Sequence, residues 1–227
     1  MPQPVTDASC PMRLVRLNLC KPAIAATDPE TRPMRCLFYV SGETPAKDLC
    51  QHWDVKYQVV IWRPSLRSIA PPHCPKMTSG VWWLFHICHV FRNRGYCALL
   101  VFEGKTLVHR LTVFPGYFRF PFMGQADLQI GDTYTHPAYR GRGIATVALG
   151  EIVRRISATG GELWYVTSED NVASIRVAEK AGFRLRGYGT RRSRFGMRLL
   201  GQFRIDHVLP TSMHEPHQAV DVSLHTE

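Results

Sequence analysis

The chain has 227 residues, 45% of them hydrophobic, and a formal net charge of +10 at pH 7. This length accommodates one domain, or one domain with an added subdomain, around a substantial core. The positive charge favours anionic partners, although scattered arginines could equally give a merely basic surface. The longest apolar run, residues 81–85, is too short to cross a bilayer, and no signal peptide is visible at the N-terminus.

The seven cysteines all lie in the N-terminal half, and none forms a C-x-x-C pair. An odd number without paired spacing does not form a disulfide framework, so we expect reduced thiols and a cytoplasmic location. His86 and His89 could share one helix face near Cys88, but no second ligand pair follows at a metal-binding spacing. We therefore expect no metal site.

Residues 1–75 form an N-terminal segment of short predicted strands. Residues 13–19 alternate in polarity, residues 36–40 are a short apolar run, and residues 55–62 read as a strand. The segment could be structural or could contribute to the acceptor side. Prolines at positions 71, 72 and 75 predict a loop before the next element.

Residues 76–205 alternate between strand and helix patterns. The predicted elements are a helix at 76–92 with apolar positions 81, 84, 85, 88 and 91, a hairpin of 97–102 and 106–113 around Gly104, a strand at 129–135, a helix at 144–156, a strand at 163–167, a helix at 171–180 closed by Gly182, and a strand pair at 183–188 and 195–205. This order predicts a mixed α/β sheet. The aromatic loop 117–122 either lines an acceptor pocket or packs into the core. The polar tail 206–227 is expected to be disordered.

A glycine-rich turn between a strand and a helix is the most informative motif. The stretch Tyr139-Arg-Gly-Arg-Gly-Ile-Ala145 leads into the helix at 144–156. A helix N-terminus offers unpaired backbone N–H groups and the positive end of the helix dipole. Gly141 and Gly143 allow close backbone approach, and Arg140 and Arg142 add charge. The turn predicts a polyphosphate-bearing ligand, but it fits neither the P-loop nor the dinucleotide pattern.

Two blocks of sequence carry a resemblance to a known family. Arg140-x-x-Gly143-x-Ala145 resembles the acyl-CoA pyrophosphate loop, Q/R-x-x-G-x-G/A, of the GNAT superfamily of N-acetyltransferases. Asn171-x-x-Ser174, followed by Glu179-Lys-Ala-Gly-Phe183, is similar to that family's second block. The resemblance covers residues 96–205. It implies the GNAT-like acyl-CoA N-acyltransferase fold, in which two parallel strands, here 129–135 and 163–167, splay apart and admit the pantetheine arm.

The resemblance implies acetyl-CoA as co-substrate and a set of residues that would bind it. This set is Tyr134, Thr135, Arg140, Gly141, Arg142, Gly143, Ile144, Ala145, Asn171 and Ser174. The N–H groups of the strand near residues 133–135 would polarise the thioester carbonyl. Asn171 has an alternative role as a helix cap.

The catalytic residues are not settled by the resemblance. Many family members carry a tyrosine seven residues after the helix asparagine as general acid, but here that position is Ala178. Tyr165, Tyr188, Tyr134 and Ser174 are substitute acids, with packing or capping as the alternative, and a thiolate leaving group could need no acid at all. Asp132 and Glu169 are the candidate bases. The alternative role of Asp132 is a solvent-facing or arginine-paired carboxylate, and that of Glu169 is a favourable interaction with the dipole of the nearby helix start.

We therefore predict an N-acetyltransferase that acts on the primary amine of a small molecule. The aromatic residues favour a cyclic or nucleotide-linked amine such as an amino sugar, with amino acids, peptides and polyamines as alternatives. Two other functions remain open: an acyl-CoA-binding module without catalysis, which Ala178 favours, and a tRNA-engaging transferase, which the charge favours. We expect a monomer or homodimer that does not bind a membrane. If the protein is an N-acetyltransferase of small molecules, we also expect no nucleic-acid partner.

Overall fold

The computed structural model describes residues 34–42, 53–156, 160–194 and 197–210. The predicted strand at 13–19 and the part of the predicted tail beyond residue 210 lie outside these ranges. The elements, in chain order, are β1 (Met34–Ser41), β2 (Tyr57–Trp62), α1 (Lys76–Ile87), β3 (Cys97–Glu103), β4 (Thr106–Pro115), β5 (Leu128–Thr135), a single 3₁₀ turn (Pro137–Tyr139), α2 (Ile144–Ile156), β6 (Leu163–Ser168), α3 (Val172–Lys180), β7 (Phe183–Arg194) and β8 (Met197–Val208).

The strands of the described residues form one mixed sheet in the order β2-β3-β4-β5-β6-β1-β7-β8. Only β5 and β6 are parallel neighbours; the other adjacent pairs are antiparallel. This confirms the predicted mixed α/β sheet. The sheet continues through the boundary expected near residue 75, because β2 pairs with β3 along its whole length. Strand β8 extends to Val208, into the predicted tail.

The splay between the two parallel strands is visible in their register. β5 and β6 pair only over their first residues, from Leu128 opposite Leu163 to Ile130 opposite Tyr165. Beyond that point each strand keeps its other neighbour: β5 stays paired with β4 as far as Thr135, and β6 stays paired with β1. A gap therefore opens between the carboxyl ends of β5 and β6, as the predicted fold requires.

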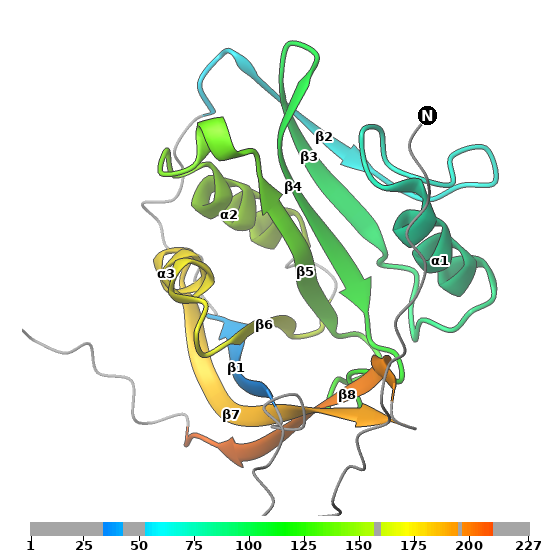
Figure 1. Ribbon diagram of the computed structural model, residues 1–227, viewed down its shortest axis with the longest axis vertical. Helices are drawn as coiled ribbons and strands as arrows, with labels where there is room; N and C mark the ends of the chain where they lie inside the picture. Colours follow the sequence, from blue (N-terminus) through cyan, green and yellow to red (C-terminus); the bar gives the residue numbers. More distant parts are fainter. Residues whose placement is uncertain (1–33, 43–52, 157–159, 195–196, 211–227) are drawn as a thin grey trace, which may run out of the picture. The chain divides into compact units, whose positions relative to one another are not determined.

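Helices cover both faces of the sheet (Figure 1). One core lies under α2 and α3, whose buried residues include Ala148, Leu149, Ile152 and Ala178. The other core lies under α1 and is dominated by aromatic rings. The loop 117–122 belongs to this second core: Tyr117 and Phe120 are each 4% exposed. The core alternative for this loop is therefore the observed one.

Helix α1 differs from the sequence prediction in length and orientation. It ends at Ile87, with Cys88 as its C-terminal cap, rather than at residue 92. Val81 and Leu84, predicted on the buried face, are 47% and 50% exposed. Phe85, which was also predicted on that face, does pack against the aromatic core, together with Trp82, which was not; both rings meet Tyr117 edge-on. Apolar residues lie all round this helix, so periodicity alone could not choose the buried face.

Strand β1 occupies a central place that the sequence did not reveal. It lies between β6 and β7, with Leu37 opposite both Thr167 and Tyr188. Its alternate residues enter the two cores, with Tyr39 under the helices α2 and α3 and Phe38 on the aromatic side. Residues at 36–40 thus connect the two halves of the sheet, although they read only as a short apolar run.

Candidate functional site

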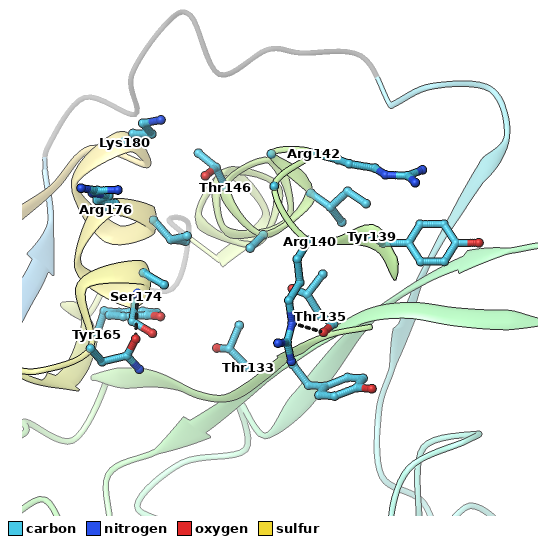
Figure 2. Close-up of a pocket in the computed structure, with 18 residues that line it drawn as sticks. Thr133, Thr135, Tyr139, Arg140, Arg142, Thr146, Tyr165, Ser174, Arg176 and Lys180 are labelled. Carbon is cyan, nitrogen blue, oxygen red and sulfur yellow. Dashed lines mark hydrogen bonds between the residues drawn. The ribbon is translucent and has the colours of Figure 1, made fainter. Parts of the chain in front are cut away.

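A cavity of about 480 Å³ lies where the splayed strands meet the starts of α2 and α3. Figure 2 shows its walls: β5 with Thr133 and Thr135, the glycine-rich turn, and the facing side of α3. The lining contains every predicted cofactor residue, namely Tyr134, Thr135, Arg140, Gly141, Arg142, Gly143, Ile144, Ala145, Asn171 and Ser174. The fold therefore brings together two blocks that are some thirty residues apart in the chain.

The glycine-rich turn is shaped by its two glycines and tied to β5. Gly141 and Gly143 have φ values of 77° and 76°, in the left-handed region that favours glycine. The Nε of Arg140 donates a hydrogen bond to the backbone oxygen of Thr135 at 3.2 Å, which holds the turn on the end of the strand. The backbone N–H groups of residues 143–145 border the cavity, and the first hydrogen bonds that close the helix are donated by the Thr146 and Val147 N–H groups to the Gly143 oxygen. The N–H groups of residues 143–145 can therefore donate to an anion.

Four cationic side chains line the cavity, and no Asp or Glu is among the described residues that line it. Arg140 and Arg142 come from the turn, and Arg176 and Lys180 lie one helical turn apart on α3. In Figure 2, Arg176 and Lys180 lie on α3, while Arg142, on the opposite wall, points away from α3 alongside Tyr139. The guanidinium of Arg142 stacks over the ring of Tyr139 at 5.0 Å and donates to the Ala138 oxygen. The wall is thus positive on both sides, as a polyphosphate requires.

Asn171 combines the two roles considered for it. Its side-chain oxygen accepts a hydrogen bond from the Ser174 backbone N–H at 3.1 Å, which caps the start of α3. Both residues also line the cavity. Because the cap fixes where α3 begins, it also fixes the placement of Arg176 and Lys180 on the next turns.

A buried histidine beneath the cavity wall was missed in the sequence. His109 on β4 is 0% exposed and pairs across the strands with Thr135. Its Nδ1 lies 2.8 Å from Thr135 Oγ1, whereas its Nε2 has no hydrogen-bond partner among the described residues. Burial, with a smaller contribution from Arg110, lowers the pKa of His109 to about 4, so the ring is neutral.

The two ring nitrogens of His109 imply a definite tautomer. A buried N–H donor without an acceptor is rarer in proteins than an acceptor without a donor. We therefore assign the proton to Nδ1, from which it donates to Thr135 Oγ1, and leave Nε2 as the unpaired acceptor. The Thr135 hydroxyl can then donate its own proton into the cavity. The alternating pattern of β4 does not single out His109, because a buried neutral histidine occupies the same positions in that pattern as an apolar core residue.

A family comparison is decisive once this geometry is known. The sequence model of the acetyltransferase (GNAT) family matches residues 61–183, more than half of the chain. This chain belongs to the GNAT family. The match runs from β2 to the start of β7, so β1 and most of the β7–β8 hairpin lie outside it.

Solved structures of GNAT proteins resemble this chain at low identity. A GNAT-family protein from Novosphingobium aromaticivorans is 18% identical, over 69% of this chain and 62% of its own, with a TM-score of 0.45. A GNAT-family acetyltransferase from Colwellia psychrerythraea is 15% identical, over 68% of this chain and 53% of its own, with a TM-score of 0.47. A tandem GNAT protein from the clavulanic acid biosynthesis pathway is also 15% identical, and this chain covers half of it. This chain thus spans between half and two thirds of the length of these proteins. Among curated proteins, none matches the chain.

The cavity fits the phosphate-bearing co-substrate that the GNAT family implies. A polyphosphate fits the free helix N–H groups, the two glycines in the left-handed region and the four cations. A narrow arm fits the gap between β5 and β6. Within the described ranges, no three His, Cys, Asp or Glu side chains cluster closely enough to hold a metal ion. The expectation of a metal-free reaction stays a prediction.

A buried alanine stands where many GNAT proteins carry the tyrosine. Ala178 is 0% exposed and belongs to the core under α3. Three of the candidate acids line the cavity, namely Tyr165, Tyr134 and Ser174, and Tyr165, on β6, sits at the last paired position of the splay. Its ring is edge-on to Phe183 at 5.9 Å, which fixes its orientation. Tyr188 lies on β7, is 44% exposed and does not line the cavity.

Asp132 lies just beyond the splay point but is turned away from the cavity lining. It sits in a bulge of β5 with a φ of 46°, two residues after Ile130. Its carboxylate is 3.3 Å from the Arg110 guanidinium, and its side chain is 45% exposed. The arginine-paired alternative is therefore observed. Positive φ is uncommon for residues other than glycine, and Asp is among those that tolerate it.

Strand β1 contributes to the site by tethering α3. The hydroxyl of Tyr39, which is 2% exposed, donates to a carboxylate oxygen of Glu179 at 3.2 Å. Tyr39 also lies directly opposite Tyr165. The strand that the sequence did not place thus supports both the helix that carries Arg176 and the tyrosine at the splay.

In the described part of the chain, the helices are too short or too polar to span a membrane.

Proposed function

We propose that this protein is an acetyl-CoA-dependent N-acetyltransferase that acts on the primary amine of a small molecule, with an amino sugar as the favoured acceptor. The observation that carries the proposal is the cavity at the open end of the β5–β6 splay, whose described lining residues include four cations and no carboxylate. Membership of the GNAT family supports acyl transfer from an acyl-CoA in general. The choice of acetyl, amine and small molecule is ours.

The residues of the turn and of α3 would neutralise and fix the diphosphate. The N–H groups of residues 143–145 would donate to its oxygens, and the four cations would balance its charge. The Thr135 hydroxyl, oriented by His109, would donate to an oxygen of the bound arm. Such positioning can supply most of the acceleration, because it holds two otherwise dilute reactants together.

Two side chains near the splay would donate or accept the protons of the reaction. Acetyl-CoA, when bound, supplies an activated thioester carbonyl. Tyr165 would hold its phenol proton where the departing sulfur develops charge, since among the candidate acids that line the cavity it is the one at the last paired position of the splay. Asp132 lies outside the cavity lining, so it would accept the ammonium proton only from an amine that approaches outside that lining and displaces the Arg110 contact at 3.3 Å.

The competing function is a module that binds acyl-CoA without catalysis. One observation favours it: Ala178 leaves no hydroxyl at the family's usual acid position. The two functions differ in turnover and not in binding. The tRNA-engaging alternative and the cytoplasmic location stay predictions.

Two measurements test the proposal. Thermal unfolding with acetyl-CoA, with ATP and NAD as controls, should show a shift specific to acetyl-CoA; a ligand at a hundredfold excess over its Kd stabilises by about 2.7 kcal/mol. Release of the CoA thiol is then followed with a panel of amino sugars, amino acids and polyamines. Thiol release that depends on an amino sugar supports the enzyme. Binding without thiol release for any amine supports the module, and an absence of binding contradicts both.

A further inference from the structure

A second polar groove lies on the β7–β8 hairpin, outside the region that matches the GNAT family model. It has a volume of about 330 Å³ and is lined by Arg192, Ser193, Gln202 and Arg204. This volume is in the range of small-molecule sites. Arg192, Ser193 and Arg204 can donate hydrogen bonds to a ligand, whereas the Gln202 amide already donates to the Phe118 oxygen at 3.0 Å. None of the four carries a negative charge.

The pairing of the strands is what brings the two arginines together. Arg192 lies opposite Gln202, and Thr190 lies opposite Arg204, so the arginines are diagonal neighbours on one face of the hairpin. Diagonal neighbours of this kind are roughly 7–8 Å apart, within reach of one shared ligand. Arg35 on β1 is opposite Thr190 from the other side, which extends the positive row.

The charge of this groove is not balanced within the described residues. Arg35 pairs with Glu169 at 3.7 Å, but neither Arg192 nor Arg204 has a carboxylate partner in the part of the chain that the structure describes. Both side chains are exposed. Two like charges held side by side repel one another, so the arrangement favours a bound anion. Arginine forks suit phosphate oxygens in particular.

The groove opens on the same face of the sheet as the acyl-CoA cavity. Leu37 of β1 packs under α2 and α3 and lies opposite Tyr188. Residues 190 and 192 follow Tyr188 at alternate positions and therefore share its face. The alternate residue Phe203 packs on the aromatic side, which places its neighbours Gln202 and Arg204 on the cavity side.

We infer that this groove is a second anion-binding site, which takes the phosphate groups of the amine acceptor. The step to the acceptor rests on the proposed function: a transferase has two substrates, and the cavity at α2 already provides four cations for the first. We therefore assign the arginines of the β7–β8 groove, on the same face, to the second substrate. The acceptor class is a small phosphate-bearing amine, such as a phosphorylated or nucleotide-linked amino sugar.

The binding test uses pyrophosphate as the probe on the full chain saturated with CoA, so that the first cavity is filled. Calorimetric titration should show binding by the unmodified protein, weakened by about tenfold or more in the double variant Arg192→Gln/Arg204→Gln. Arg184→Gln is the matched control, because Arg184 is exposed on β7 opposite Val40 and lies outside the groove. No binding by the CoA-saturated protein, or an equal loss in the control, overturns the site.

The kinetic test compares glucosamine, glucosamine 1-phosphate and UDP-linked glucosamine at saturating acetyl-CoA. The double variant should raise the KM of the phosphate-bearing amines by about tenfold and leave the KM values of glucosamine and acetyl-CoA unchanged. Equal use of all three amines by the unmodified protein overturns the acceptor assignment. If no amine is acetylated, the proposed function fails, while the pyrophosphate titration still decides the site. Tighter binding of a short single-stranded RNA than of pyrophosphate, lost in the double variant, assigns the surface to nucleic acid and overturns the small-molecule assignment.

Discussion

The hydrogen bond between His109 and Thr135 gives the sharpest quantitative prediction. Thr135→Val removes the hydroxyl that accepts from His109 Nδ1 at 2.8 Å. The ring is 0% exposed and its Nε2 is already unpaired among the described residues, so the variant leaves both ring nitrogens without a partner. A buried polar group left unsatisfied costs about 1–3 kcal/mol. We expect a loss of stability of that size.

The assay is a double-mutant cycle measured by chemical denaturation at neutral pH. His109→Leu removes the ring, so the further change Thr135→Val should cost much less in that background, with a coupling energy of about 1–2 kcal/mol. Thr133→Val is the matched control: it lines the same cavity on the same strand but is exposed, and it should change stability by less than about 0.5 kcal/mol. Equal losses for Thr133→Val and Thr135→Val, or a coupling energy near zero, would refute the reasoning.

The same histidine gives a pH dependence of stability with a definite sign. Its pKa falls from 6.5 to about 4 on burial, so between these values the unfolded chain binds a proton that the folded protein does not. The stability that depends on a neutral His109 is therefore complete above pH 6.5 and decreases as the pH falls toward 4, by up to about 3 kcal/mol. Denaturation curves of the His109→Leu variant should lack this component. An identical pH profile in that variant would contradict a buried neutral histidine.

The remaining predictions concern the cavity itself. Gly143→Asp should weaken acetyl-CoA binding by more than about tenfold, since it adds a negative charge to the turn proposed to bind phosphate. Gly104→Asp is the control, because it adds the same charge and comparable backbone strain in the β3–β4 turn, where φ is 57°. This variant should bind acetyl-CoA normally in a titration. Tyr165→Phe should lower kcat by roughly 10- to 100-fold without changing acetyl-CoA affinity, whereas Tyr188→Phe should leave kcat unchanged. A kcat loss confined to Tyr188→Phe would reverse that assignment.

The turn that we propose to bind phosphate could be predicted from the sequence because it is built by neighbours in the chain. The turn at residues 140–145, its two glycines in the left-handed region and the start of α2 are set by local backbone preferences. The cap formed by Asn171 spans only three residues. The alternating and helical patterns likewise placed the β3–β4 hairpin, α2, β6 and α3 close to their observed bounds.

The tertiary structure alone decided which distant residues meet. The insertion of β1 between β6 and β7, the pairing of Asp132 with Arg110, the contact of His109 with Thr135 and the meeting of Arg192 and Arg204 all depend on strand order and register. Alternation along a strand tells which residues share a face, but it does not tell which strand lies alongside or at which register. The sequence by itself therefore determined the local phosphate-binding motif and the family. The choice among candidate catalytic residues and the proposed anion-binding groove on β7 and β8 came only from packing between strands far apart in the chain.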